Sequence, residues 1–152
     1  MRINVRGVGE SAGVHDGNGA EEEDARAALN WLAERHPHVE CWAAGFSFGS
    51  RTVFGLALKE PTIRRLLLVG FPARVYPLDG VDQLTIPTLF IWGDRDEFGT
   101  RVDLLQQYPN LPATHALQEI EGADHFFRRF TKELESQVRE YAQAALAPDA
   151  LG

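Results

Sequence analysis

The strongest indication of chemistry in this chain is the run Gly45-Phe46-Ser47-Phe48-Gly49. It follows an apolar stretch and opens a helical pattern, the strand-to-helix context that a nucleophilic serine in G-x-S-x-G requires. The turn is so sharp that neighbouring side chains would collide, so glycine is expected at both flanking positions. We predict that Ser47 is a nucleophile. A serine that only caps its helix is the alternative, and it would leave the two glycines unexplained.

A serine hydroxyl is a weak nucleophile near neutral pH, so it needs a base and a group that orients that base. His125 follows the apolar stretch 114–120, and Asp94, Asp96 and Glu97 follow the stretch 88–92. Loops that follow parallel strands emerge at one edge of a sheet, so these residues can converge on Ser47. We predict His125 as the base and an acid of the 94–97 segment as its partner, unless these acids only shape a turn.

The remaining ionisable groups have simpler expected roles. The acidic run 21–24 is read as a solvated helix start, where the helix dipole favours negative charge, rather than as a metal site. Asp124 is expected to support its loop, and Cys41 lies within an apolar strand pattern and is expected in the core. The histidines outside the proposed site lie in turns, at a helix end or at a strand edge: His15, His36, His38 and His115.

These residues need a parallel sheet flanked by helices to position them. Short apolar runs alternate with helical patterns, which predicts a three-layer, mostly parallel α/β fold of about five strands. The expected strands are Arg2–Val5, Val39–Gly45, Ile63–Gly70, Thr88–Trp92 and Thr114–Ile120. The expected helices are Ala20–His36, Phe48–Lys59 and Phe127–Leu146, the last with an apolar stripe that should cover a sheet face.

Length and charge limit the kinds of protein this chain can be. Its 152 residues suit one domain, expected over 1–147 with a loose tail at 148–152. A net charge of −7 argues against a nucleic-acid or anionic-membrane surface. The single cysteine excludes an internal disulfide, and there is no apolar stretch of membrane-spanning length. We therefore expect a cytoplasmic protein without a cofactor or metal.

Four blocks of sequence resemble a known family. They are the segments 4–13, Gly45–Arg51, Gly93–Phe98 and Gly122–Phe127, and they span nearly the whole chain. Together they look like the small bacterial α/β-hydrolases related to dienelactone hydrolases and S33-type serine peptidases. The order serine, acid, histidine along the chain is also that of this superfamily.

The resemblance implies a function and a set of site residues. By position, Ser47 resembles the nucleophile, Asp96 the triad acid and His125 the base, and the backbone N–H of Phe48 resembles one oxyanion donor. Dienelactone hydrolases proper carry cysteine at the elbow, so serine here favours ester or amide substrates, and we predict the hydrolysis of small soluble esters through an acyl-enzyme. The segment Phe71–Ile86, where larger relatives insert a lid, is expected to be only a loop and to leave the site open.

The family resemblance also implies an element that this chain lacks. In the family, strands precede the block at 4–13, and the loop after one of them provides the second oxyanion donor. We therefore expect an N-terminally truncated domain. Either Arg2–Val5 pairs with Val39–Gly45, or the latter strand keeps an open edge that offers a site for self-association. The alternative function is a catalytically impaired or non-catalytic fragment, or a binding protein of the same fold.

Overall fold

A four-stranded parallel sheet forms the centre of the computed structural model, which describes residues 1–15, 17 and 19–147. The strands lie in chain order, β1-β2-β3-β4. The elements are α1 (Ala20–Arg35), β1 (Cys41–Phe46), α2 (Phe48–Ala57), β2 (Ile63–Val69), β3 (Thr88–Gly93), α3 (Arg101–Gln107), β4 (His115–Ile120) and α4 (Thr131–Ala145). The α/β fold class predicted from the sequence is confirmed, with four strands instead of about five.

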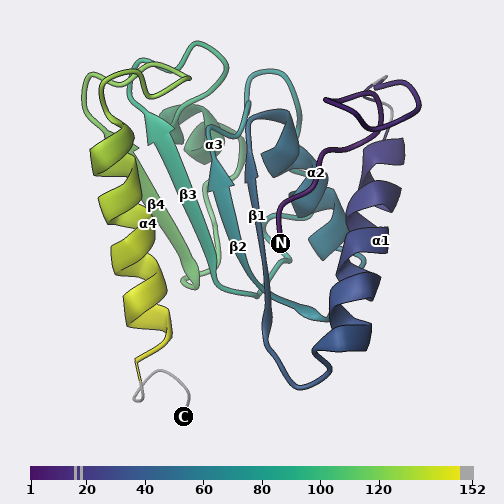
Figure 1. Cartoon of the computed structure of the whole chain (residues 1–152). Helices are drawn as coiled ribbons and strands as arrows, with labels where there is room; N and C mark the ends of the chain where they lie inside the picture. Colours follow the sequence, from purple (N-terminus) through teal and green to yellow (C-terminus); the bar gives the residue numbers. More distant parts are fainter. Residues whose placement is uncertain (16, 18, 148–152) are drawn as a thin grey trace.

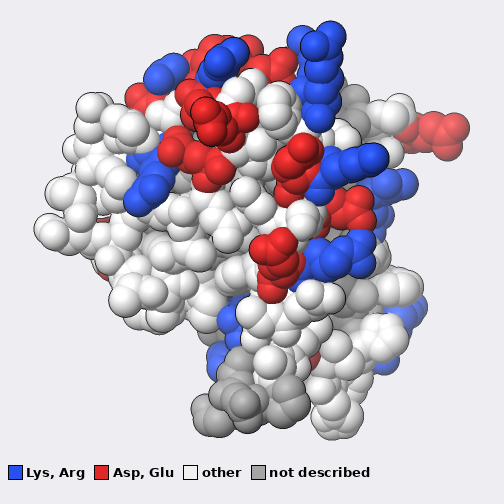
Figure 2. Space-filling model, turned by 90° about the vertical axis from the view of Figure 1, so that its left-hand side faces the viewer, with Lys and Arg blue, Asp and Glu red and all other residues white. Residues whose placement is uncertain are grey.

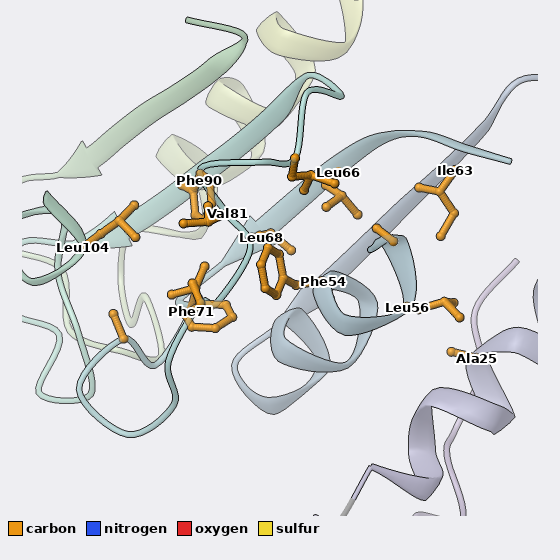
Figure 3. Packing of buried hydrophobic residues seen from close by; sticks show 14 of the residues in the cluster. Ala25, Phe54, Leu56, Ile63, Leu66, Leu68, Phe71, Val81, Phe90 and Leu104 are labelled. Carbon is orange, nitrogen blue, oxygen red and sulfur yellow. The ribbon is translucent and has the colours of Figure 1, made fainter. Parts of the chain in front are cut away.

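Both faces of the sheet are covered, which explains why the inner strands are apolar throughout. On one face, Leu66 and Phe90 pack in a cluster with side chains of α1, α2 and α3. On the other, Leu67 and Ile91 pack against α4. Figure 1 shows α4 on the side of the sheet opposite α2, and Figure 3 shows the larger cluster around Phe54.

The strand predicted at Arg2–Val5 is wrong. Residues 2–5 form no strand, and Arg6, which follows them, bonds to α1. The backbone N–H of Arg6 donates to Asp24 Oδ2 of α1 at 2.8 Å, and its guanidinium holds the same carboxylate. A turn follows, in which the Gly7 N–H donates to the Ala12 carbonyl. Of the two arrangements expected for β1, the open edge is therefore the one seen: within the described residues β1 pairs only with β2.

Two helices differ from the prediction. The last one begins at Thr131 and not at Phe127, because Phe127 and Arg129 have the left-handed φ angles 51° and 70°, which no helix accommodates. The predicted apolar stripe still packs on the sheet, with Leu134 and Val138 partly buried against the core. The short helix α3 was not expected. It begins with a capping box in which Thr100 and Asp103 bond to each other's backbone N–H groups.

The acidic start of α1 is only partly solvated, contrary to expectation. Glu23 is exposed, but Glu21 is buried, with His15 Nδ1 2.6 Å from its Oε1. Burial on its own would raise the pKa of Glu21, but hydrogen bonds from backbone N–H groups and from His15 outweigh it and lower this pKa. The run therefore ties the N-terminal segment to the helix.

The face of the molecule that carries α4 has charged and uncharged parts. On the side that carries α4, acidic and basic side chains intermingle beside a wide uncharged area (Figure 2). No helix in the described part of the chain is long and apolar enough to cross a membrane. The segment 71–86 contains neither helix nor strand, as predicted. The predicted tail 148–152 lies outside the described residues, as do positions 16 and 18 of the turn before α1.

Candidate active site

The serine sits on a strained turn between β1 and α2. Ser47 has φ 53° and ψ −123°, a backbone conformation that costs a non-glycine residue free energy and is typical of functional sites. Its N–H donates to the Val69 carbonyl at 2.9 Å, which fixes the turn to the end of β2. Its side chain makes no capping hydrogen bond to α2, so the capping alternative does not describe this serine.

The two glycines of the motif have different roles. A Cβ added at Gly45 would lie 2.2 Å from the Gly49 carbonyl oxygen, so only glycine fits where the strand meets the helix. A Cβ added at Gly49 would meet nothing within 4 Å. The expectation that both positions exclude side chains is therefore wrong for Gly49. Gly49 matters because its backbone lies where a side chain at position 45 would be.

Three predicted residues come together at the carboxyl edge of the sheet. His125 Nε2 lies 2.8 Å from Ser47 Oγ, and His125 Nδ1 lies 2.8 Å from Asp96 Oδ2. Asp96 and His125 are only 1% and 3% exposed. A carboxylate can only accept, so Nδ1 carries the proton and Nε2 offers its lone pair to the serine hydroxyl. This is the geometry in which a histidine can remove a proton from a serine.

The neighbouring acids hold the loops rather than the histidine. The second oxygen of Asp96 accepts the N–H of Phe98 at 2.9 Å. Asp94 accepts the N–H of Gly122 at 2.7 Å and so joins the loop after β3 to the loop that carries His125. Asp124 accepts two N–H groups of its own loop, the supporting role expected of it. Of the acids in the 94–97 segment, Asp96 is thus the one bonded to the histidine.

Three aromatic rings that the sequence did not single out surround the histidine. The ring centroids of Phe46, Phe98 and Phe126 lie 5.1, 4.6 and 5.2 Å from that of His125. All three side chains are exposed, by 45%, 38% and 53%. Each of these phenylalanines lies within two residues of Ser47, Asp96 or His125 in the sequence, and this proximity was the signal that indicated an aromatic surrounding. They keep water from the imidazole and present an apolar rim to the solvent.

On the other side of Ser47 lies Phe48, the first residue of α2. The first N–H groups of a helix have no acceptor within it, so the Phe48 N–H is free to face an oxyanion. Its ring contacts His15 with centroids 4.6 Å apart and faces Tyr76 at 6.4 Å. Gly17 lies next to this ring: a Cβ added there would be 3.8 Å from it.

The other ionisable groups lie apart from the triad. The exposed His36 and His38 follow α1, and His115 bonds to the Val81 carbonyl at 3.1 Å. Burial lowers the pKa of His115, against the effect of that hydrogen bond. Cys41 is half-buried, and burial raises the pKa of its thiol, so it packs rather than reacts. Within the described residues no group of three acidic, histidine or cysteine side chains could hold a metal ion.

Comparison with known proteins identifies the family. The model of the alpha/beta hydrolase domain matches residues 20–150, most of the chain. The chain belongs to the alpha/beta hydrolase family. An uncharacterized protein from Rickettsia prowazekii is 32% identical over 93% of this chain and 63% of its own length.

Two solved structures of this family resemble the chain closely. A putative alpha/beta hydrolase of unknown function from Agrobacterium tumefaciens is 28% identical, with a TM-score of 0.86 over 94% of this chain and 68% of that one. A serine hydrolase without lid from Xanthomonas campestris is also 28% identical, with a TM-score of 0.84 over 95% of this chain and 65% of that one. The chain thus spans about two thirds of the length of its relatives.

Proposed function

We propose that the protein is a serine hydrolase that cleaves small soluble esters through an acyl-enzyme. The observation that carries this proposal is the pair of 2.8 Å contacts that link Ser47 to His125 and His125 to Asp96. Membership of the alpha/beta hydrolase family supports it. The roles of the three residues follow from their order in this chain of contacts.

The acylation step begins when Ser47 Oγ attacks the ester carbonyl and His125 Nε2 takes the hydroxyl proton. Asp96 stabilises the imidazolium and keeps its tautomer. The negative charge on the carbonyl oxygen faces the Phe48 N–H at the positive end of α2. The tetrahedral intermediate then collapses: the bond to the leaving oxygen breaks, His125 returns the proton to that oxygen, and the alcohol departs.

The deacylation step regenerates the serine. Water attacks the acyl carbonyl and gives a proton to His125. The bond to Ser47 Oγ breaks, the proton returns to that oxygen, and the carboxylic acid leaves. The same residues therefore serve both halves of the reaction.

The surroundings of the site favour small esters with an apolar alcohol. The leaving oxygen must lie within reach of His125, so the alcohol lies against the exposed rings of Phe46, Phe98 and Phe126. The loop 71–86 forms no helix over the site, in keeping with the lidless relative. Aryl acetates therefore suit both the rim and the open approach.

The test is the hydrolysis of 4-nitrophenyl acetate, with product released per protein measured over many turnovers. We expect turnover by the unaltered chain and only background hydrolysis by Ser47→Ala. Ser136→Ala, which removes an exposed hydroxyl on α4, is the matched control and should leave the rate unchanged. If one oxyanion donor serves instead of two, the rate should be lower than in hydrolases with two donors by about 10² to 10³. No turnover above the Ser47→Ala background would favour a non-catalytic protein of this fold.

A further inference from the structure

A cation lies one helical turn beyond the nucleophile without a carboxylate partner among the described residues. Arg51 of α2 makes no ion pair in the described part of the chain, and its one side-chain hydrogen bond, to the Gly17 carbonyl, is long at 3.4 Å. Arg51 therefore keeps unused donors for an anion.

Two aromatic rings hold this guanidinium in place beside the site. Its central carbon lies 4.7 Å from the ring centroid of Tyr76 and 5.8 Å from that of Phe48. Phe48 directly follows Ser47 and provides the proposed oxyanion donor. Cation-π contacts of this kind orient a guanidinium without neutralising it. The charge is thus positioned next to the residue that faces the reacting carbonyl.

The chemistry of the triad assigns this side of Ser47 to the acyl group. The leaving alcohol must lie by His125, whose neighbours Phe46 and Phe126 line the groove between β1 and α4. Tyr76 instead packs with the cluster on the opposite face of the sheet, where α2 lies. The acyl chain is attached to the carbonyl carbon on the side away from the alcohol. It therefore extends toward the face that carries α2 and Tyr76.

We infer that Arg51 forms a subsite for an anionic acyl group, so that the preferred substrates are esters whose acyl chain ends in a carboxylate. This inference rests on the proposed function, because it assigns the acyl side from the action of His125. A planar guanidinium can bind a carboxylate through two parallel hydrogen bonds, a geometry that an ammonium group does not reproduce. Arg51 is a binding residue here and takes no part in proton transfer.

The test compares two aryl esters that differ in one group. 4-Nitrophenyl hydrogen adipate and 4-nitrophenyl hexanoate have acyl chains of equal length, and only the first ends in a carboxylate. We expect a higher kcat/KM for the adipate. Arg51→Gln should lower that value by about 10- to 100-fold, mostly through KM, at the scale of a charge-assisted hydrogen bond. The hexanoate value should not change, and Arg51→Lys should recover part of the adipate preference.

A control variant and the pattern of the two esters separate the alternatives. Arg139→Gln removes an exposed guanidinium on α4 and should leave both esters unaffected. A fall in both esters for Arg51→Gln would show that the arginine only supports the fold and would overturn the subsite. Equal kcat/KM values for the two esters in the unaltered chain would overturn it while leaving the hydrolase intact.

If neither ester is hydrolysed, the proposed function fails, and binding decides the subsite. Calorimetric titration of the Ser47→Ala variant with the adipate ester should show binding. The double variant Ser47→Ala, Arg51→Gln should show none. Absence of binding, or binding that Arg51→Gln does not change, would overturn the subsite.

Discussion

The steric difference between the two glycines around the nucleophile can be tested by adding one methyl group to each. In Gly45→Ala the new Cβ would lie 2.2 Å from the Gly49 carbonyl oxygen, where real contacts of this type are essentially never below 3.0 Å. The strand and the helix must therefore separate by about 1 Å, and a misplacement of that size can cost about 100-fold in rate. We expect Gly45→Ala to lose about that factor in kcat and to unfold at lower temperature.

Gly49→Ala is the matched variant because it adds the same methyl group where the structure has space. Alanine replaces glycine inside a helix, so this variant should be more stable by about 0.5–1 kcal/mol and should keep its activity. Hydrolysis of 4-nitrophenyl acetate and thermal unfolding, measured side by side, give both values. Equal losses in the two variants, or full activity of Gly45→Ala, would refute the steric reasoning.

Three further predictions follow from other parts of the structure. Asp96→Asn should lower kcat by about 10⁴ because His125 loses its orienting acceptor, whereas Asp94→Asn, which breaks one contact between loops, should cost far less; the reverse ranking in steady-state kinetics would exchange their roles. Because the pKa of His115 is lowered in the folded chain, the unfolded chain binds this proton first as the pH falls. The contribution of His115 to stability is therefore complete above pH about 6.5 and is lost as the pH falls through the folded pKa. His115→Gln should therefore reduce the fall in melting temperature over that interval, and identical pH profiles would contradict the effect. The open edge of β1 should give self-association that rises with concentration in sedimentation experiments and weakens in Ala44→Lys, which places a charge on this exposed edge residue; a chain that stays monomeric would refute it.

The local sequence pointed to the residues of the candidate site because their placement depends on short-range rules. Glycine at position 45 is required by a contact only four residues away, and the motif records it directly. Ser47, Asp96 and His125 each lie in a turn or loop that follows a strand of one parallel sheet, so topology brings them to the same edge. The choice of Asp96 over Asp94 came from the family resemblance, since both follow β3 within three residues.

The errors arose where tertiary contacts decide the structure. Arg2–Val5 alternates like a strand, but Arg6 finds a carboxylate on α1, and this long-range ion pair determines the course of the segment. The start of α4 was placed early because the left-handed residues Phe127 and Arg129 carry no glycine signal. The capping box that begins at Thr100 was the available signal for α3, a helix of seven residues that is followed by Pro109 and Pro112.

The central claim, that His125 activates Ser47, is tested most directly by covalent labelling with a fluorophosphonate probe, read by mass spectrometry of the intact chain and its peptides. The unaltered protein should gain one adduct, located on Ser47. Ser47→Ala should gain none, and His125→Gln should react much more slowly because the hydroxyl has lost its base. Labelling that persists in Ser47→Ala, or an unaltered chain that does not react, would contradict the account.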